Sequence, residues 1–213
     1  MRLAFDLSLY LVTDRDLSLG RPLKEIVQKA VAGGVTMVQL REKNAPTNEY
    51  IREALSVKEL LKQHKVPLII NDRVDVALAV DADGVHIGQN DMPWHMARRL
   101  LGRDKLIGLS VESVEQLEEA NKADVDYIGI SPVFTTPTKE DIEKGLGLEG
   151  TAEIVRKSVH PSVAIGGIKP GNAVEVLNTG VNGISVVSAI CSAEDPQAAA
   201  KDLAEIGKKK QGD

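Results

Sequence analysis

The stretch "ADGVHIG", Ala82–Gly88, leads into a short apolar run and resembles two other such entries in the chain. They are "GGVTMVQ" at Gly33–Gln39 and "GVNGISV" at Gly180–Val186. Likeness of this kind, even when weak, indicates a repeated structural unit. Eight short apolar runs occur in all, and they are Leu7–Thr13, Val35–Arg41, Pro67–Asp72, Gly84–Gly88, Leu106–Ser110, Asp126–Ser131, Ser162–Gly167 and Gly183–Ser188.

The segments between these runs carry apolar residues at helical spacing, so helices are predicted to separate the strands. One helix is expected to start at Ser113, because Gln116 follows at the spacing of a capping box. Another is expected to start at Pro196, which suits a first helical turn. An apolar face is clear before the second run, at Leu23, Ile26, Val27, Ala30 and Val31.

Eight strand–helix units within 213 residues predict an α/β fold, a single (β/α)8 TIM barrel that spans residues 1–213 as one domain. The alternative is an open, doubly wound parallel sheet, which more usually has about five or six strands. No G-x-G-x-x-G pattern opens a helix, so the dinucleotide-binding fingerprint of such sheets is absent.

The composition excludes several classes of protein. Hydrophobic residues make up 43% of the chain and aromatic ones only 3%, which favours an aliphatic core of parallel strands covered by helices. The net charge is −5, and no basic stripe alternates with aromatic residues, so a nucleic-acid-binding surface is not expected. No apolar stretch approaches the roughly 18–20 residues of a membrane span, and a cytoplasmic protein is expected.

The only cysteine is Cys191, which excludes a disulfide framework within the chain and suits a reducing compartment. It follows an apolar strand, and no His or Asp motif stands near it. We therefore expect a small core residue at this position, with a catalytic nucleophile as the alternative.

Polar and charged residues gather where the predicted strands end, and strand starts carry fewer of them. In a TIM barrel the carboxyl ends of the strands share one face, and that face holds the active site. The residues are Asp14, Arg15, Gln39, Arg41, Glu42, Lys43, Asn71, Asp72, His86, Gln89, Asp91, Ser110, Thr135–Lys139, Gly166, Gly167, Val187 and Ser188.

The segments "IGGI" and "VVSAI", after the seventh and eighth runs, have the composition of a phosphate cradle. Such a cradle holds a phosphate with backbone N–H groups and the N-terminus of a short helix. Gly166 and Gly167 would let the backbone approach the ligand closely. The alternative is that the two glycines only make a turn.

Asp72 and Asp91 end or closely follow neighbouring strands, and two carboxylates from adjacent loops suit one Mg²⁺ ion. This ion uses one or two carboxylates and completes its coordination with water and phosphate oxygens. The alternative is that Asp91 caps the helix at Pro93 and Asp72 caps a helix beginning near Val74.

Arg41, Lys43 and Lys139 are cations at strand ends in a chain of net negative charge. They indicate a ligand with more negative charge than one phosphate. A Schiff-base lysine is the alternative, but such lysines usually lie within a strand. Two anion sites, one with a metal, imply a monophosphate and a diphosphate substrate. His86 is equally compatible with an acid–base role and with a structural one.

With these residues the chain resembles the thiamine phosphate synthase family, also called the thiamine-phosphate pyrophosphorylases. The resemblance covers nearly the whole chain and rests on the order and spacing of several motifs. The motifs are "VQLREKN" (Val38–Asn44), "LIINDRVDVALAVDADGVHIGQND" (Leu68–Asp91), "GLSVES" (Gly108–Ser113), "SPVFTTPTK" (Ser131–Lys139), "AIGGI" (Ala164–Ile168) and "ISVVSAI" (Ile184–Ile190).

The resemblance implies that a pyrimidine diphosphate is joined to the ring nitrogen of a thiazole monophosphate, which releases pyrophosphate and forms thiamine phosphate. It also implies Mg²⁺ held by Asp72 and Asp91. Arg41, Lys43, Ser110 and Lys139 are implied as catalytic. The implied pyrimidine-diphosphate contacts are Gln39, Arg41, Lys43, Asn71, Ser110 and Lys139, and the implied thiazole-phosphate contacts are Thr136, Thr138, Gly167, Val187 and Ser188.

Some positions depart from the family pattern, namely Ser131, where glycine is common, and Asn90, where an acidic residue is common. A related branch, the thiazole tautomerases, shares the barrel, but its catalytic histidine would fall near Glu112. The alternatives are therefore a tautomerase-like enzyme and a barrel that binds thiamine precursors without turnover. Self-association is left open.

Overall fold

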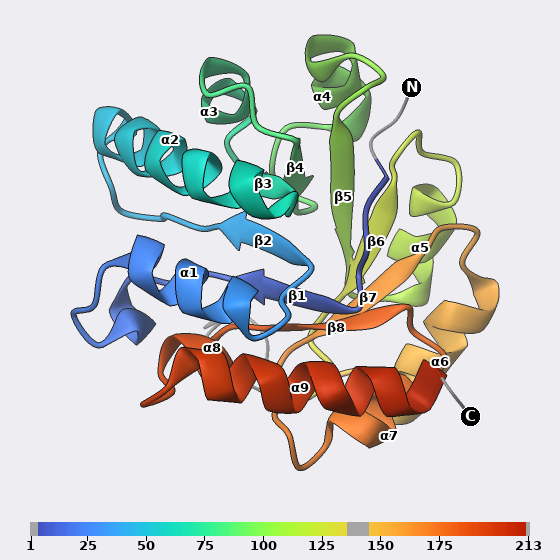
Figure 1. Ribbon diagram of the computed structural model, residues 1–213. Coiled ribbons are helices and arrows are strands. Elements are labelled where there is room, and N and C mark those ends of the chain that lie inside the picture. The colour runs from blue at the N-terminus through green and yellow to red at the C-terminus, as the bar shows by residue number, and fades with distance from the viewer. Residues whose placement is uncertain (1–3, 136–144, 212–213) are drawn as a thin grey trace.

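The computed structural model describes residues 4–135 and 145–211. Its eight strands are all parallel and form a closed barrel in the order β1 to β8, and β1 pairs with β8. This confirms the predicted TIM barrel and excludes the open sheet (Figure 1). The strands are β1 (Leu9–Val12), β2 (Met37–Leu40), β3 (Leu68–Asn71), β4 (Gly84–Ile87), β5 (Leu106–Val111), β6 (Tyr127–Ile130), β7 (Ser162–Ile165) and β8 (Gly183–Val186).

Helices surround the strands. The first α-helix, α1, lies beside the C-terminal helix α9, so the layer of helices also closes around the barrel (Figure 1). Gly33, at the end of α1, lies so close to α9 that a Cβ atom there would be 2.4 Å from the Gln197 carbonyl oxygen. The helices are η1 (Asp16–Ser18), α1 (Leu23–Ala32), α2 (Thr47–His64), α3 (Val74–Ala79), α4 (Trp94–Leu101), α5 (Val114–Ala120), α6 (Gly147–Lys157), α7 (Ala173–Leu177), α8 (Ser188–Cys191) and α9 (Pro196–Gln211).

Both predicted helix starts are confirmed. Ser113 is the N-cap of α5, and its side chain accepts a hydrogen bond from the Gln116 backbone N–H at 3.3 Å. The return bond differs from the capping-box prediction, because the Gln116 side chain accepts from the N–H of Glu112, one residue earlier, at 2.7 Å. The helix α9 begins at Pro196, as expected.

The apolar residues form two clusters. The larger lies between the barrel and its helices, and it includes the predicted α1 face, with Leu23, Ile26, Val27 and Ala30 buried. The smaller lies inside the barrel, away from the carboxyl ends of the strands, and consists of Leu7, Tyr10, Met37, Ile69, Leu106, Tyr127 and Val163. Side chains therefore fill the barrel interior near the amino ends of the strands. Room for a ligand is left only near the carboxyl ends.

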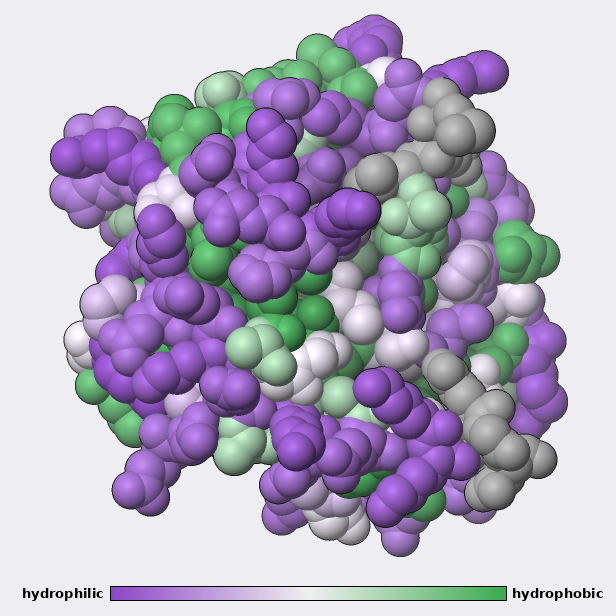
Figure 2. Space-filling view, in the orientation of Figure 1, coloured by the Kyte–Doolittle hydropathy of each residue, from purple (hydrophilic) through white to green (hydrophobic). Residues whose placement is uncertain are grey.

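Figure 2 shows a mainly hydrophilic face in which less hydrophilic residues gather toward the centre. Within residues 4–135 and 145–211, no helix is long and apolar enough to cross a membrane.

Candidate active site

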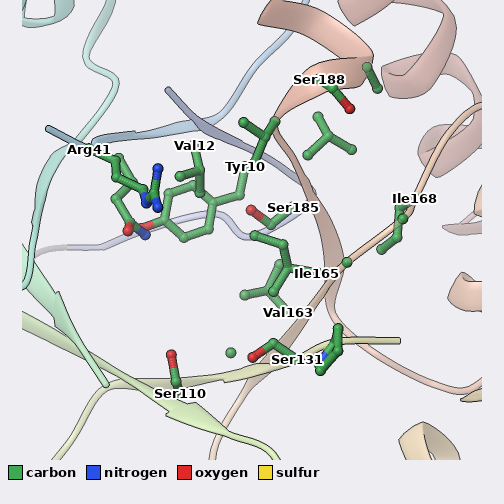
Figure 3. Close-up of a pocket in the computed structure, with 18 of the residues that line it drawn as sticks. Tyr10, Val12, Arg41, Ser110, Ser131, Val163, Ile165, Ile168, Ser185 and Ser188 are labelled. Atoms are coloured by element: carbon green, nitrogen blue, oxygen red, sulfur yellow. The ribbon is translucent and has the colours of Figure 1, made fainter. Parts of the chain in front are cut away.

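A cavity of about 470 Å³ opens at the carboxyl ends of the strands, and every strand of the barrel contributes to its lining (Figure 3). This is the position expected for the active site of a TIM barrel. The sequence-predicted residues that the structure brings together in its lining are Gln39, Arg41, Asn71, His86, Ser110, Thr135, Gly166, Gly167, Val187 and Ser188; Lys43, Asp72 and Asp91 are not among the lining residues. The predicted residues Thr136, Thr138 and Lys139 lie outside the described residues.

A chain of side-chain hydrogen bonds crosses the floor of the cavity. Gln39 Nε2 donates to the Tyr10 hydroxyl at 2.9 Å, and the Tyr10 and Tyr127 hydroxyls lie 2.9 Å apart. The Tyr127 hydroxyl is 3.2 Å from His86 Nδ1, and His86 Nε2 is 3.0 Å from Ser110 Oγ. His86 is thus hydrogen-bonded through both ring nitrogens, which supports the structural alternative for this residue.

The two tyrosines in this series of hydrogen bonds, Tyr10 and Tyr127, were not predicted as site residues. They lie near the starts of the apolar strands β1 and β6, and their side chains are fully buried, as in an ordinary core. One signal was available in the sequence, because Gly108 and Gly129 interrupt β5 and β6. Glycine inside a strand often marks a place where another group approaches closely.

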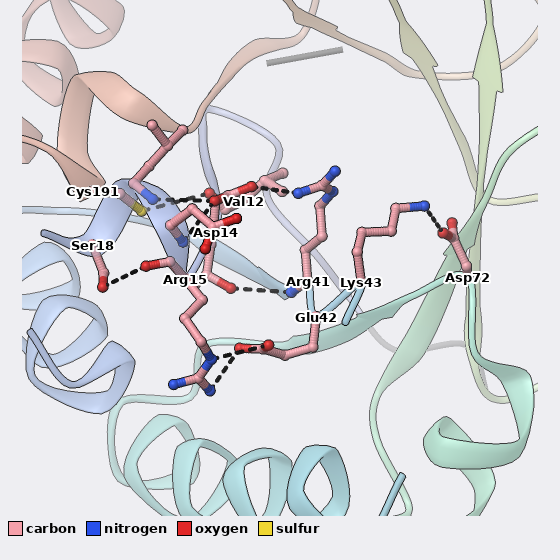
Figure 4. Close-up of polar contacts among 12 residues, drawn as sticks. Val12, Asp14, Arg15, Ser18, Arg41, Glu42, Lys43, Asp72 and Cys191 are labelled. Carbon is pink, nitrogen blue, oxygen red and sulfur yellow. Dashed lines mark hydrogen bonds and ion pairs between the residues drawn. The ribbon is translucent and has the colours of Figure 1, made fainter. Parts of the chain in front are cut away.

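Arg41 and Lys43 each pair with a carboxylate (Figure 4). The Arg41 guanidinium forms an ion pair with Asp14, and Lys43 Nζ lies 2.6 Å from Asp72 Oδ2. The backbone also holds this rim, since the N–H of Arg41 donates to Thr13 Oγ1 at 3.0 Å. The sequence placed Asp14 at a strand end but did not identify it as the partner of Arg41.

Asp72 and Asp91 lie close enough for their charges to interact. Burial raises the pKa of the Asp91 carboxyl, and the neighbouring Asp72 carboxylate raises it further, against the hydrogen bond from the Gly88 N–H at 2.7 Å. Neither aspartate caps a helix through its side chain, because α3 and α4 start without a side-chain cap. The capping alternative is therefore wrong.

This pair fits a magnesium site better than a site for a metal that needs several protein ligands. Two like charges held together are stabilised by a cation, and Mg²⁺ needs only one or two carboxylates. Within the part of the chain that the structure describes, no group of three or more His, Cys, Asp or Glu residues could hold a metal ion.

On the other side of the cavity, the loop after β7 and the start of α8 meet. Gly166 and Gly167 have φ angles of +112° and +66°, which favour glycine. A Cβ atom on Gly166 would lie 2.6 Å from Pro132 Cβ, so this loop has no room for a side chain. Ser188 begins α8, where the first-turn N–H groups have no intrahelical acceptor.

Two further residues are buried near the carboxyl end of β8, and only Ser185 lines the cavity. Ser185 Oγ lines it and is buried without a hydrogen-bond partner among the described residues, so it is available to a ligand or to water (Figure 3). Cys191 is buried, and this burial raises the pKa of its thiol to about 11. An activated nucleophile would need a lowered pKa, so the core prediction is confirmed.

A closed parallel barrel with a pocket at the carboxyl ends of its strands is the arrangement of a TIM-barrel enzyme. The sequence profile of the family described as thiamine monophosphate synthase matches residues 9–190. The chain belongs to this family, and its activity is that of a thiamine-phosphate synthase, a transferase.

Similar proteins agree with this assignment. The thiamine-phosphate synthase of Clostridium novyi (strain NT) is 53% identical over 198 residues, which cover 93% of this chain and 97% of the relative. That of Vibrio campbellii (strain ATCC BAA-1116) is 54% identical over 195 residues, which cover 92% and 95%. The solved thiamine phosphate pyrophosphorylase from Pyrococcus furiosus superposes with a TM-score of 0.88 at 44% identity, covering 95% of this chain and 96% of that one.

Proposed function

We propose that the chain joins a pyrimidine diphosphate to a thiazole monophosphate, releases pyrophosphate and forms thiamine phosphate. The observation that carries this proposal is that residues suited to anions lie on two different sides of one cavity. Figure 3 places Arg41 on one side and Ser188 on the other, with Val12 and Tyr10 between them. Two anionic substrates can then approach each other across an interior sheltered from water.

The pyrimidine diphosphate is proposed to occupy the side formed by β2 to β5. Gln39 and Ser110 offer an amide and a hydroxyl at the floor, where a heteroaromatic ring would be recognised. Arg41 and Lys43 stand at the rim, where they would bind the diphosphate. Contacts from Asn71 and Lys139 complete this proposed subsite.

The thiazole phosphate is proposed to bind between the β7 loop and α8. Gly167 permits close approach of the backbone, and the N–H groups at Val187 and Ser188 suit a phosphate. Thr136 and Thr138 are proposed to add hydroxyl contacts to the same phosphate.

Asp72 and Asp91 are proposed to hold Mg²⁺, which suits their mutual charge repulsion. When bound, this ion would neutralise charge on the departing pyrophosphate. Arg41 and Lys43 would stabilise the same charge once they exchange their present carboxylate partners for phosphate oxygens.

The remaining task of the protein is to hold the thiazole nitrogen beside the pyrimidine methylene carbon. We propose a dissociative reaction, in which pyrophosphate leaves before the new C–N bond forms. The electron-rich amino ring stabilises the cationic carbon, and the protein contributes position and charge. No protein nucleophile is needed, which agrees with the protonated, buried thiol of Cys191.

The test is one incubation with both substrates and Mg²⁺, followed by measurement of pyrophosphate and thiamine phosphate. Both products should appear in equal amounts, and excess chelator should abolish them. Lys43→Gln should lower kcat/KM by roughly 10- to 100-fold, the loss of one charge-assisted hydrogen bond. Lys122→Gln is the matched control, because Lys122 is also an exposed lysine paired with a carboxylate, Glu119, at 2.6 Å.

The outcomes separate the alternatives. Isomerisation of the thiazole phosphate without coupling would indicate a tautomerase, and binding of both substrates without products would indicate a non-catalytic barrel. Full activity in chelator would remove Mg²⁺ from the proposal. A single domain over residues 1–213, a cytoplasmic location and self-association stay predictions.

A further inference from the structure

The hydrogen-bond chain at the floor of the cavity joins two residues that are proposed to contact the pyrimidine. It runs from Gln39 on β2 through Tyr10 on β1, Tyr127 on β6 and His86 on β4 to Ser110 on β5. Gln39, Tyr10, His86 and Ser110 line the cavity, and Tyr127 is fully buried beneath it. The polarity of Gln39 is therefore linked to that of Ser110 through the side chains at the cavity floor.

The barrel interior leaves space for this chain at two glycines. A Cβ atom on Gly108 would lie 2.2 Å from Tyr127 Cζ and 2.4 Å from His86 Nδ1. A Cβ atom on Gly129 would lie 2.9 Å from His86 Cε1. The Tyr127 hydroxyl and the His86 ring thus fill the space that side chains of β5 and β6 would otherwise occupy.

With Gln39 Nε2 facing the Tyr10 hydroxyl, the donors and acceptors of this hydrogen-bond chain run in one direction. Tyr10 accepts from Gln39 Nε2, so its own hydrogen is free to point at Tyr127. Tyr127 then donates to His86 Nδ1, and His86 carries its hydrogen on Nε2, which donates to Ser110 Oγ. In the reverse direction, Tyr10 would accept twice and bury its own hydrogen without an acceptor in the chain.

Burial also keeps both tyrosine hydroxyls protonated, which is the form that the hydrogen-bond chain requires. It raises the pKa of Tyr10 and of Tyr127, so both hydroxyls remain protonated at any working pH. Each can therefore accept one hydrogen bond and donate another.

We propose that Tyr127 is a positioning residue that holds His86 as its Nε2–H tautomer and thereby makes the Ser110 hydroxyl a donor toward the cavity. At the other end, Gln39 donates to Tyr10 and keeps its carbonyl oxygen for the ligand. The floor then recognises a ring that offers an N–H donor beside Gln39 and an acceptor atom beside Ser110. An aminopyrimidine has both groups, so this inference rests on the proposed function and adds its basis for ring selectivity.

The test is a tautomer measurement on His86 that requires no turnover. In the ¹⁵N-labelled protein, a long-range ¹⁵N–¹H spectrum distinguishes a protonated ring nitrogen from an unprotonated one, and loss of a signal in His86→Gln assigns it among the four histidines. We expect a protonated Nε2 and an unprotonated Nδ1 in the unaltered protein. A protonated Nδ1 would overturn the proposal even if Tyr127→Phe fails to fold.

Tyr127→Phe removes the hydroxyl but keeps the ring, so His86 should then populate both tautomers. The KM for the pyrimidine diphosphate should rise roughly 3- to 10-fold, the range of one hydrogen bond, while the KM for the thiazole phosphate stays constant. The matched control is Tyr50→Phe. Tyr50 is also buried, but its hydroxyl donates to the Leu40 carbonyl and takes no part in the hydrogen-bond chain at the cavity floor. It should change neither the His86 tautomer nor this KM.

A folded Tyr127→Phe protein with an unchanged tautomer and unchanged KM would refute the positioning role. Failure of the proposed function looks different, because the unaltered protein would then form no thiamine phosphate while the spectrum still reports on His86.

Discussion

Replacing Gly108 with alanine adds one methyl group at the tightest point of the barrel interior, and we expect a large loss of stability and of pyrimidine binding. The new Cβ atom would lie 2.2 Å from Tyr127 Cζ and 2.4 Å from His86 Nδ1. The tyrosine ring has little room to retreat, because its centroid lies 6.0 Å from that of Tyr10 and 5.9 Å from that of Phe5.

The magnitude follows from the size of the overlap. Carbon atoms in contact prefer a separation of about 3.5–4.0 Å, so the ring must move by more than ~1 Å. Overpacking of a core usually costs about 1–3 kcal/mol, and a fully buried ring held by other rings on two sides places Gly108→Ala near ~3 kcal/mol. For a protein of this length, that lowers the melting temperature by roughly 6–12 °C.

The assay is urea unfolding of the folded variant together with the KM of each substrate. Gly171→Ala is the matched control, since a Cβ atom there meets nothing within 4 Å, and we expect it to stay within about 0.5 kcal/mol of the unaltered protein. If Gly108→Ala unfolds within ~1 kcal/mol of the unaltered protein and keeps its KM for the pyrimidine diphosphate, the packing described for the cavity floor is wrong.

Three further predictions concern other parts of the chain. Ser188→Asp should raise the KM for the thiazole phosphate about tenfold, because it places a carboxylate at the proposed cradle, and a neutral Ser188→Asn should raise it less. Arg98→Met should cost about 3–5 kcal/mol in urea unfolding, since it removes the guanidinium that lies 2.6 Å from the buried Asp126 carboxylate, and a value below ~1 kcal/mol would contradict this. Because burial raises the pKa of Cys191 to about 11, only about a thousandth of the native thiol is ionised at pH 8. Its reaction with a thiol reagent should be slow until the protein unfolds, and rapid labelling of folded protein would argue otherwise.

The fold could be predicted because parallel strands buried on both faces have continuous apolar runs. Each predicted run overlaps a strand. Most runs extend beyond it, as Leu7–Thr13 and Gly183–Ser188 extend beyond β1 and β8, whereas β5 continues one residue past its run, to Val111. At the carboxyl ends of these two runs, the residues beyond the strands include the polar Thr13 and Ser188, which follow β1 and β8 toward the site. Local sequence cannot tell where the barrel hydrogen bonds stop, because these depend on the neighbouring strand.

The site could be predicted only where its residues lie at strand ends. Arg41, Lys43, Asp72 and Asp91 were predicted in this way; Arg41 lines the cavity, Lys43 pairs with Asp72, and Asp91 interacts with Asp72. Pairings across strands could not be read, because the partners are far apart in sequence, as Asp14 and Arg41 are.

The buried tyrosines could not be identified for another reason. Within an apolar strand, Tyr10 or Tyr127 has the same sequence signature whether its hydroxyl is bonded to another site residue or to a backbone carbonyl. Only the three-dimensional neighbours show that both hydroxyls belong to one hydrogen-bond chain.

The pairing of the rim cations has a consequence for how an anion enters the cavity. Arg41 and Lys43 are already neutralised by Asp14 and Asp72, so these two cations present little net positive field to an approaching polyanion. Binding is then an exchange of one anionic partner for another. Since dissolved salt screens the existing pairs as well as the new ones, substrate affinity should depend on ionic strength much less steeply than it would with two unpaired cations.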